Sequence, residues 1–155
     1  MATRAIIAVE RASGWRGRYA HWDNYPERMV GVLGELVERD GITQVVTTLI
    51  NDNPSWSIID PKAGDESMEP YGDRDQVGLR KGYGIVHTDI DKDDDMAWYT
   101  ETTGAYSWAQ YVYVIRRNGV SVYTVESDDE SGDEVLKHLA CHTWEEAKRQ
   151  AGIGV

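Results

Sequence analysis

The chain has 155 residues and a formal net charge of −11, from 27 acidic and 16 basic residues. This length is typical of one globular domain. So acidic a chain lacks the basic footprint that phosphate contacts need, and direct nucleic-acid binding is not expected. The charge fits a partner protein with a basic surface, or a mimic of a polyanion.

The acid excess lies mainly in the middle of the sequence. Residues 51–102 carry thirteen acids and five bases, whereas residues 1–50 carry six of each. The single cysteine, Cys141, rules out an internal disulfide and favours a reducing compartment. The apolar run near the start is too short for a signal peptide, and no stretch has the length of a transmembrane helix. We therefore expect a cytoplasmic location and no membrane contact.

The first two predicted elements are a strand and a helix on either side of an aromatic segment. Residues 3–10 contain a continuous apolar run, which predicts a strand buried on both faces. Gly14 and Gly17 are then expected to break regular structure. A helix over residues 26–39 follows, with Asn24 and Glu27 at the spacing of a capping box.

The helix at 26–39 carries an apolar stripe and two glycines. Gly31 and Gly34 weaken a helix by about 1 kcal/mol each relative to Ala, but they allow another element to approach closely. Asp40-Gly41 is a typical stop signal. The predicted buried stripe consists of Met29, Val32, Leu33 and Leu36.

The middle of the chain is less regular. Apolar residues in 42–50 recur at helical spacing, which favours a helix although their β-branching favours a strand. Residues 60–82 are rich in Gly, Pro and charge, and they predict a long polar surface loop. A strand is expected at 83–88 and a short one at 98–100, separated by the acidic run 89–95.

The last third begins with a hairpin. Residues 111–116 and 120–125 are rich in β-branched and aromatic residues and flank Asn118-Gly119, which is a strong hairpin signal. Short helices are predicted at 133–140 and 143–150, the second with Thr143 and Glu146 as a capping box. The order of elements predicts a single α+β domain over 1–155, with an antiparallel sheet and helices packed mainly on one face.

Residues 14–26 contain the densest set of groups that both stack and hydrogen-bond. Arg16 and Arg18 alternate, so in an extended segment both guanidinium groups point the same way. Arginine with aromatic rings suits planar or anionic ligands, and a His–Asp pair can tune proton transfer. The candidate ligand-binding residues are Arg16, Arg18, Tyr19, His21, Trp22, Asp23 and Tyr25.

A structural role for the same segment is the competing interpretation, and it is favoured. In it, Trp22 and Tyr25 fill the core, and the arginines pair with acidic residues from the middle of the chain. The sequence contains no phosphate loop, nucleophile elbow or dinucleotide-binding loop. Hence no catalytic residue is assigned and no cofactor is expected.

Two metal hypotheses are weak. The acidic run matches the first three ligand positions of an EF-hand at Asp89, Asp91 and Asp93, but it lacks the glycine and the final glutamate. A solvated loop or an acidic contact surface explains it better. His138 and His142 are four residues apart beside Cys141, but no second ligand pair has zinc-site spacing.

Residues 17–26 read Gly-Arg-Tyr-Ala-His-Trp-Asp-Asn-Tyr-Pro. This resembles a motif of uncharacterised small proteins of actinobacteria and their phages, in which Gly stands in place of Asn24. The run Trp-Ser-Ile-Ile-Asp-Pro at 56–61 also resembles a segment of that group. The resemblance implies a phage or accessory-gene context. It brings no known activity.

The leading expectation is a non-enzymatic accessory protein that binds a host protein through an acidic, aromatic-rich surface. The alternative is a protein that binds a small anionic or nucleotide-like ligand with the cluster at 14–26. A hydrolase that uses His21 and Asp23 ranks below both. The sequence leaves the oligomeric state open.

Overall fold

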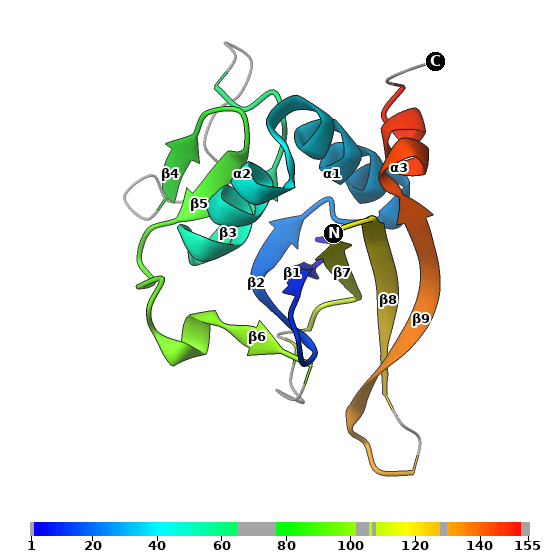
Figure 1. Cartoon of the computed structure of the whole chain (residues 1–155). Helices are drawn as coiled ribbons and strands as arrows, with labels where there is room; N and C mark the ends of the chain where they lie inside the picture. Colours follow the sequence, from blue (N-terminus) through cyan, green and yellow to red (C-terminus); the bar gives the residue numbers. More distant parts are fainter. Residues whose placement is uncertain (1, 65–76, 102–105, 107, 128–129, 153–155) are drawn as a thin grey trace.

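A mixed sheet of nine strands organises the chain (Figure 1). The computed structural model describes residues 2–64, 77–101, 106, 108–127 and 130–152. The strands are β1 (Ala5–Glu10), β2 (Trp15–Trp22), β3 (Ser55–Ile59), β4 (Val77–Arg80), β5 (Gly84–His87), β6 (Tyr99–Thr100), β7 (Tyr111–Arg116), β8 (Gly119–Ser127) and β9 (Glu134–Thr143). The helices are α1 (Pro26–Asp40), α2 (Ile42–Val46) and α3 (Trp144–Gln150), with a π-helical turn η1 (Thr47–Asn51) and a 3-10 turn η3 (Asp95–Ala97).

The strand order is β4-β5-β3-β2-β1-β7-β8-β9. Strand β6 pairs with the first half of β2, on the same edge of β2 as β3. The predicted α+β class is confirmed. The sheet is not wholly antiparallel, because β1 runs parallel to β7 and β2 runs parallel to β3. Both parallel pairs join strands that are far apart in sequence, so no local pattern announces them.

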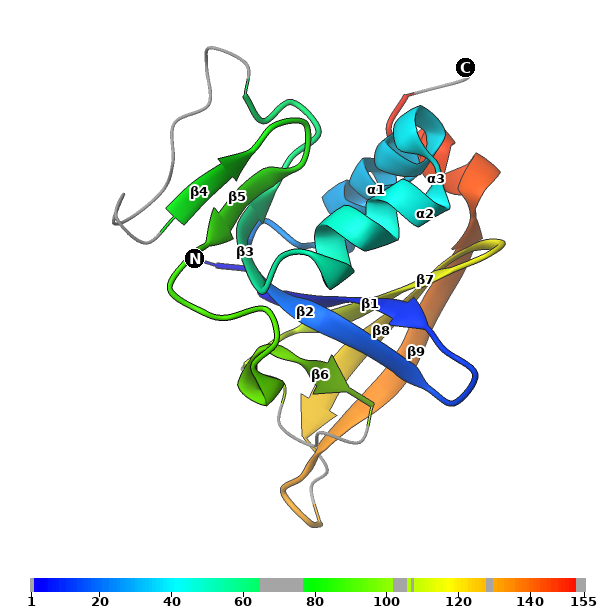
Figure 2. The same cartoon turned by 60° about the vertical axis from the view of Figure 1, so that its left-hand side comes forward.

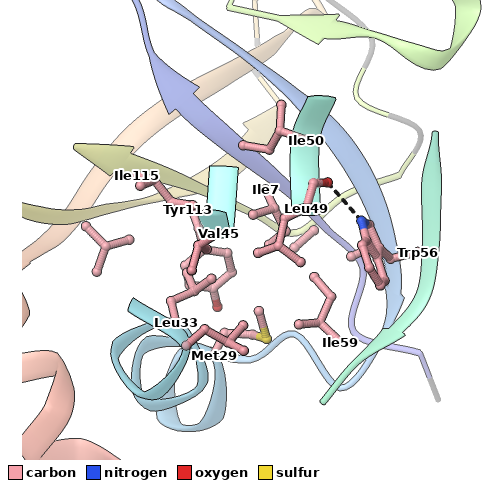
Figure 3. Packing of buried hydrophobic residues seen from close by; sticks show 14 of the residues in the cluster. Ile7, Met29, Leu33, Val45, Leu49, Ile50, Trp56, Ile59, Tyr113 and Ile115 are labelled. Carbon is pink, nitrogen blue, oxygen red and sulfur yellow. Dashed lines mark hydrogen bonds between the residues drawn. The ribbon is translucent and has the colours of Figure 1, made fainter. Parts of the chain in front are cut away.

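The three helices lie on one face of the sheet, as predicted (Figure 2). Beneath them, the main core joins apolar side chains of α1, α2 and η1 to those of the central strands (Figure 3). Trp56 of β3 is fully buried there, and its Nε1 donates to the Leu49 carbonyl at 2.9 Å. The bond satisfies the one polar group of the indole inside the core.

The opposite face of the sheet carries a smaller apolar cluster. Every other residue of β1 and β7 points to this side, where Tyr106 and Ala109 pack over them. The cluster consists of Ile6, Ala8, Trp15, Tyr106, Ala109, Val112 and Val114. Strand β1 is therefore buried on both faces, as its apolar run predicts.

The two predicted glycines of α1 do allow another element to approach. A Cβ atom on Gly34 would lie 2.6 Å from the carbonyl carbon of Ala147 in α3, and one on Gly31 would lie 3.0 Å from the backbone nitrogen of Ala151. Helix α3 thus sits against α1 at a distance that only glycine permits at Gly34. Of the predicted stripe, Met29, Leu33 and Leu36 are fully buried, and Val32 is half-buried.

Several local predictions are confirmed. The helical reading of 42–50 matches α2 and η1, and the hairpin at 111–125 matches β7 and β8. Gly41 ends α1 with a φ of 85°, and the Thr143 hydroxyl accepts from the Glu146 backbone N–H at the start of α3.

The capping box at Asn24 is wrong. Tyr25 is the N-cap of α1, and no side chain caps the helix. Asn24 is fully buried instead: its amide nitrogen donates to the Thr3 carbonyl at 3.0 Å, and its own carbonyl accepts from the Tyr113 hydroxyl. These two bonds tie the start of α1 to the sheet.

Two assignments of secondary structure are also wrong, and one strand is missing from the prediction. Residues 134–143 form strand β9, where a helix is predicted over 133–140. Residues 55–59 form a buried strand that the sequence analysis does not assign. The expected loop at 60–82 contains strand β4 at its end, and its residues 65–76 lie outside the described part of the chain. None of the helices in the described ranges combines the length and apolarity needed to cross a bilayer.

Candidate functional site

The segment predicted as a binding loop is mostly strand β2, so its side chains alternate between the two faces of the sheet. Gly17 does not break this strand. It lies where a Cβ atom would collide with the backbone of β1. Arg16, Arg18 and Trp22 fall on the helix side, whereas Tyr19 and His21 fall on the other. The seven predicted residues therefore do not form one site.

Arg18 is a fully buried structural cation. Its guanidinium group donates to three backbone carbonyls: Ile50 at 2.6 Å, Ala97 at 3.0 Å and Lys92 at 3.0 Å. The group also stacks on Trp98, with Cζ 3.3 Å from the ring centroid. Burial lowers the pKa of Arg18 to about 10, and neighbouring Arg16 acts in the same direction. Arg18 thus stays charged at neutral pH.

Arg16 lies on the same side, as the alternation predicts. It donates to the Asn51 side chain at 3.0 Å, and its Cζ lies 4.3 Å from the centroid of the Trp98 ring. Among the described residues, neither arginine forms an ion pair with a carboxylate. The structural interpretation of the arginines gains support from their contacts, but their partners are carbonyls, an amide and an indole rather than acids.

The end of the segment is more exposed than the structural interpretation predicts. Trp22 is half-buried and makes a T-shaped ring contact with His21, and Tyr25 is 41% exposed. Asp23 is exposed and adopts a φ of 62°. Its backbone carbonyl accepts from Arg28, and within the described part of the chain no ion pair joins it to His21. The His–Asp pair considered for a hydrolase is not assembled.

Tyr19 and His21 form a pair on the face opposite the helices. The Tyr19 hydroxyl and His21 Nδ1 lie 2.8 Å apart. Burial lowers the pKa of His21, and the charges of Arg4 and His87 lower it further. Burial raises the pKa of Tyr19. At neutral pH this pair is therefore a neutral imidazole bonded to a phenol.

Three further polar residues come to the same face from distant parts of the sequence. Arg4 lies one position beyond the Ala5–Ala20 pair in the register of β1 and β2, which places it opposite His21. Ser55 pairs with Tyr19 in the parallel register of β2 and β3, and its hydroxyl lies 2.9 Å from His87 Nδ1. The sequence analysis misses all three: Arg4 comes beside His21 through the β1–β2 hairpin, which was not predicted, and Ser55 and His87 come there through the pairing of β3 with β2 and β5.

A hollow of about 350 Å³ opens over this polar group. We call its polar lining residues, Arg4, Tyr19 and Ser55, the floor, and its exposed apolar lining residues, Ile90, Met96 and Trp108, the rim. Met96 and Trp108 are 84% and 83% exposed on that rim, although both have large apolar side chains. The full lining consists of Arg4, Tyr19, Pro54, Ser55, Ile90, Met96, Ala97, Tyr99 and Trp108.

The acidic run borders the same hollow. Its aspartates are exposed, and Ile90 and Met96, which lie within and just after the run, line the hollow. We call the exposed side chains of Asp89, Ile90, Asp91, Asp93, Asp94, Asp95, Met96 and Trp108 the acidic aromatic surface. Trp108 adopts a φ of 66°, a left-handed conformation that costs a non-glycine residue about 1–2 kcal/mol.

Neither metal hypothesis finds a ligand cluster. In the ranges that the structure describes, no three His, Cys, Asp or Glu side chains come together in a way that could hold an ion. His138, Cys141 and His142 lie on strand β9 rather than on a helix, so the predicted i,i+4 geometry does not form.

Comparison with known proteins adds no relative: no family model, no curated protein and no solved structure matches the chain. The motif resemblance at 17–26 therefore remains an expectation. Inferences about function therefore rest on the geometry and charge of the described residues.

Proposed function

We propose that this protein is a non-enzymatic accessory protein that binds a basic surface of a host protein through its acidic aromatic surface. The observation that carries the proposal is the pair Met96 and Trp108, both more than four-fifths exposed on the rim of one hollow. Large exposed apolar side chains that are grouped and rimmed by polar residues are typical of interaction sites.

The arrangement matches the usual anatomy of a protein interface. Tryptophan and methionine are enriched at the centres of interfaces, and tryptophan dominates binding energy when it is buried by a partner. Around this centre, the exposed aspartates of 89–95 form a charged rim. A carboxylate rim favours basic partners, speeds their association and disfavours acidic ones, nucleic acids among them.

The conformation of Trp108 supports the same role. A left-handed backbone at a bulky residue is costly, and such outliers cluster at functional sites. The Trp108 indole is exposed to solvent, so its packing within the chain does not offset the cost of the left-handed backbone. A partner that covers the indole would supply the missing burial. We also propose that the protein comes from a phage or an accessory gene, as the motif implies, and that it acts in the cytoplasm.

The test is affinity capture from a host lysate, followed by direct binding measurements on the purified captured protein. The double variant Met96→Ala/Trp108→Ala is compared with Leu139→Ala, which removes an equally apolar side chain that is 53% exposed on β9. We expect the double variant to bind at least about tenfold more weakly, which corresponds to roughly 1.4 kcal/mol. We expect Leu139→Ala to bind like wild type.

A second experiment tests the role of the aspartate charges. Asp89→Asn/Asp91→Asn should slow association, and added salt should weaken wild-type binding more than binding by this variant. Capture of only acidic proteins, or a partner that the double variant retains and Leu139→Ala loses, would contradict the proposal. So would the absence of any specific partner.

A further inference from the structure

Arg4 is a cation that has no counter-ion among the residues that the structure describes. Within the described residues its side chain makes no ion pair and no hydrogen bond, and its Nε is buried without a partner. This contrasts with Arg18, whose buried guanidinium group has three carbonyl acceptors. A buried unpaired donor costs about 1–3 kcal/mol, and more when it is charged. The Nε has almost no exposed surface, so an external acceptor would bind the terminal nitrogens of the guanidinium group, and the position of Arg4 in the lining of the hollow marks the place for it.

The groups around Arg4 suit such an acceptor. Arg4 is anchored through its carbonyl, which accepts from the Gln110 backbone N–H at 2.8 Å, and its side chain lines the floor of the hollow. Tyr19 and Ser55 line the same hollow, and their hydroxyl groups lie within hydrogen-bond distance of His21 and His87. Because burial lowers the pKa of both His21 and His87, their rings are neutral at neutral pH. Arg4 is therefore the cation that faces the hollow.

We infer that the hollow binds a small organic monocarboxylate. Its carboxylate would accept from the Arg4 guanidinium group, whose planar fork matches two carboxylate oxygens. Its apolar part would lie against Ile90, Met96, Tyr99 and Trp108, which form the upper wall. The volume of about 350 Å³ is at the lower end of small-molecule sites, so the ligand is small.

The aspartates next to the hollow favour a ligand of low negative charge. The exposed aspartates of 89–95 repel anions, and the repulsion grows with the number of negative charges. A single carboxylate pairs with the single positive charge of Arg4, whereas phosphate at neutral pH brings extra charge, and the described lining of the hollow offers no second cation for it. Ile90, Met96 and Trp108 belong both to this hollow and to the acidic aromatic surface, but Arg4 belongs to the hollow alone, so Arg4 variants test this inference separately from the proposed protein partner.

The first measurement uses the wild-type protein and three probes: benzoate, its uncharged analogue benzamide, and inorganic phosphate. Titration is followed by calorimetry and by NMR shifts of the Trp108 indole. We expect saturable binding of benzoate, with benzamide and phosphate weaker by at least about tenfold. If benzamide binds as tightly as benzoate, if phosphate binds more tightly, or if benzoate does not bind, the inference is overturned.

The second measurement identifies the cation. Arg4→Gln keeps most of the side-chain length and removes the charge, and it should weaken benzoate binding at least about tenfold without changing benzamide binding. Arg4→Lys should retain part of the affinity. Arg117→Gln, at an exposed arginine of the β7–β8 turn, is the matched control and should bind like wild type. Equal loss in Arg4→Gln and Arg117→Gln would overturn the assignment, and thermal unfolding of each variant confirms that it is folded.

Should Arg4→Gln fail to fold, Tyr19→Phe replaces it. Removing the hydroxyl at the floor should weaken benzoate binding about threefold to tenfold and leave benzamide binding unchanged. Failure of this inference leaves the proposed protein interface intact, because Asp89→Asn/Asp91→Asn tests that interface without changing a residue that lines the hollow. Conversely, a wild-type protein that binds benzoate but captures no partner would overturn the proposed interface and leave this inference standing.

Discussion

The indole ring of Trp98 covers the guanidinium group of Arg18, with Cζ 3.3 Å from the ring centroid. This contact joins strand β2 to the segment that enters β6. The three carbonyls that Arg18 binds come from η1, the acidic run and η3, so one side chain holds three separate pieces of backbone. Arg18 thereby fixes the segment that presents Ile90 and Met96 at the hollow.

Replacing Arg18 should destabilise the protein strongly. Arg18→Met keeps the volume but leaves three carbonyls without a donor, and we expect the free energy of unfolding to fall by about 2–4 kcal/mol. Arg16→Met is the matched control, because Arg16 is only half-buried and donates one hydrogen bond, to Asn51, beside its contact with Trp98. It should cost less than about 1 kcal/mol. Urea unfolding measures both, and equal losses would contradict the role given to Arg18.

Local patterns predicted the elements whose contacts are close in sequence. The helix of 26–39, the helical stretch of 42–50 and the hairpin of β7 and β8 are of this kind, and each matches the structure. The parallel neighbours of β1 and β2 could not be predicted in this way. Their pairing is decided by burial of whole strands across the sheet.

Strand β9 explains why a helix was predicted wrongly over 133–140. In its pairing with β8, Val122 is opposite Ala140 and Tyr123 is opposite His138, so Leu139 is an extra residue in a β-bulge. The bulge interrupts the strict alternation by which a strand is recognised in a sequence. The neighbouring strand β8, rather than local preference, determines the structure of this segment.

The candidate site divides along similar lines. The same-side placement of Arg16 and Arg18 followed from alternation and is confirmed by their shared contact with Trp98. Trp98 itself was not foreseen as their partner, and Arg4 was not foreseen at the hollow. Both placements depend on which strands lie next to β2, and the sequence of β2 does not contain that information.

Gly34 should not tolerate a methyl group. Gly34→Ala gains about 1 kcal/mol of helix propensity, but its Cβ would meet backbone of α3 at 2.6 Å, which a flexible side chain cannot relieve. We expect a net loss of about 1–3 kcal/mol in the free energy of unfolding. At Gly31 the nearest atom is 3.0 Å away, beyond the end of α3, where the chain can shift. Gly31→Ala should therefore cost less, and a denaturation series in which Gly34→Ala is the more stable variant would contradict this packing.

His87 should make stability depend on pH. Burial lowers the pKa of His87 below its ordinary value, and Asp89 offsets part of that shift. As pH falls, the unfolded chain takes up this proton first, so the contribution is complete above about pH 6.5 and is lost as pH falls through the lower, folded value. His87→Gln should lose less stability than wild type between about pH 7.5 and 5.5. Chemical denaturation at both pH values tests this, with His138→Gln, at an exposed histidine of β9, as the control.

Trp108 should be replaceable by glycine at little cost to the fold. Glycine adopts positive φ readily, whereas alanine keeps the strain that the tryptophan now carries at 66°. Because the indole is 83% exposed, neither substitution removes much buried surface. We therefore expect Trp108→Gly to be more stable than Trp108→Ala by about 0.5–1 kcal/mol in urea unfolding. Both variants should lose partner binding equally, since both lack the indole, so an alanine variant as stable as the glycine one would mean that the backbone at this position is not strained.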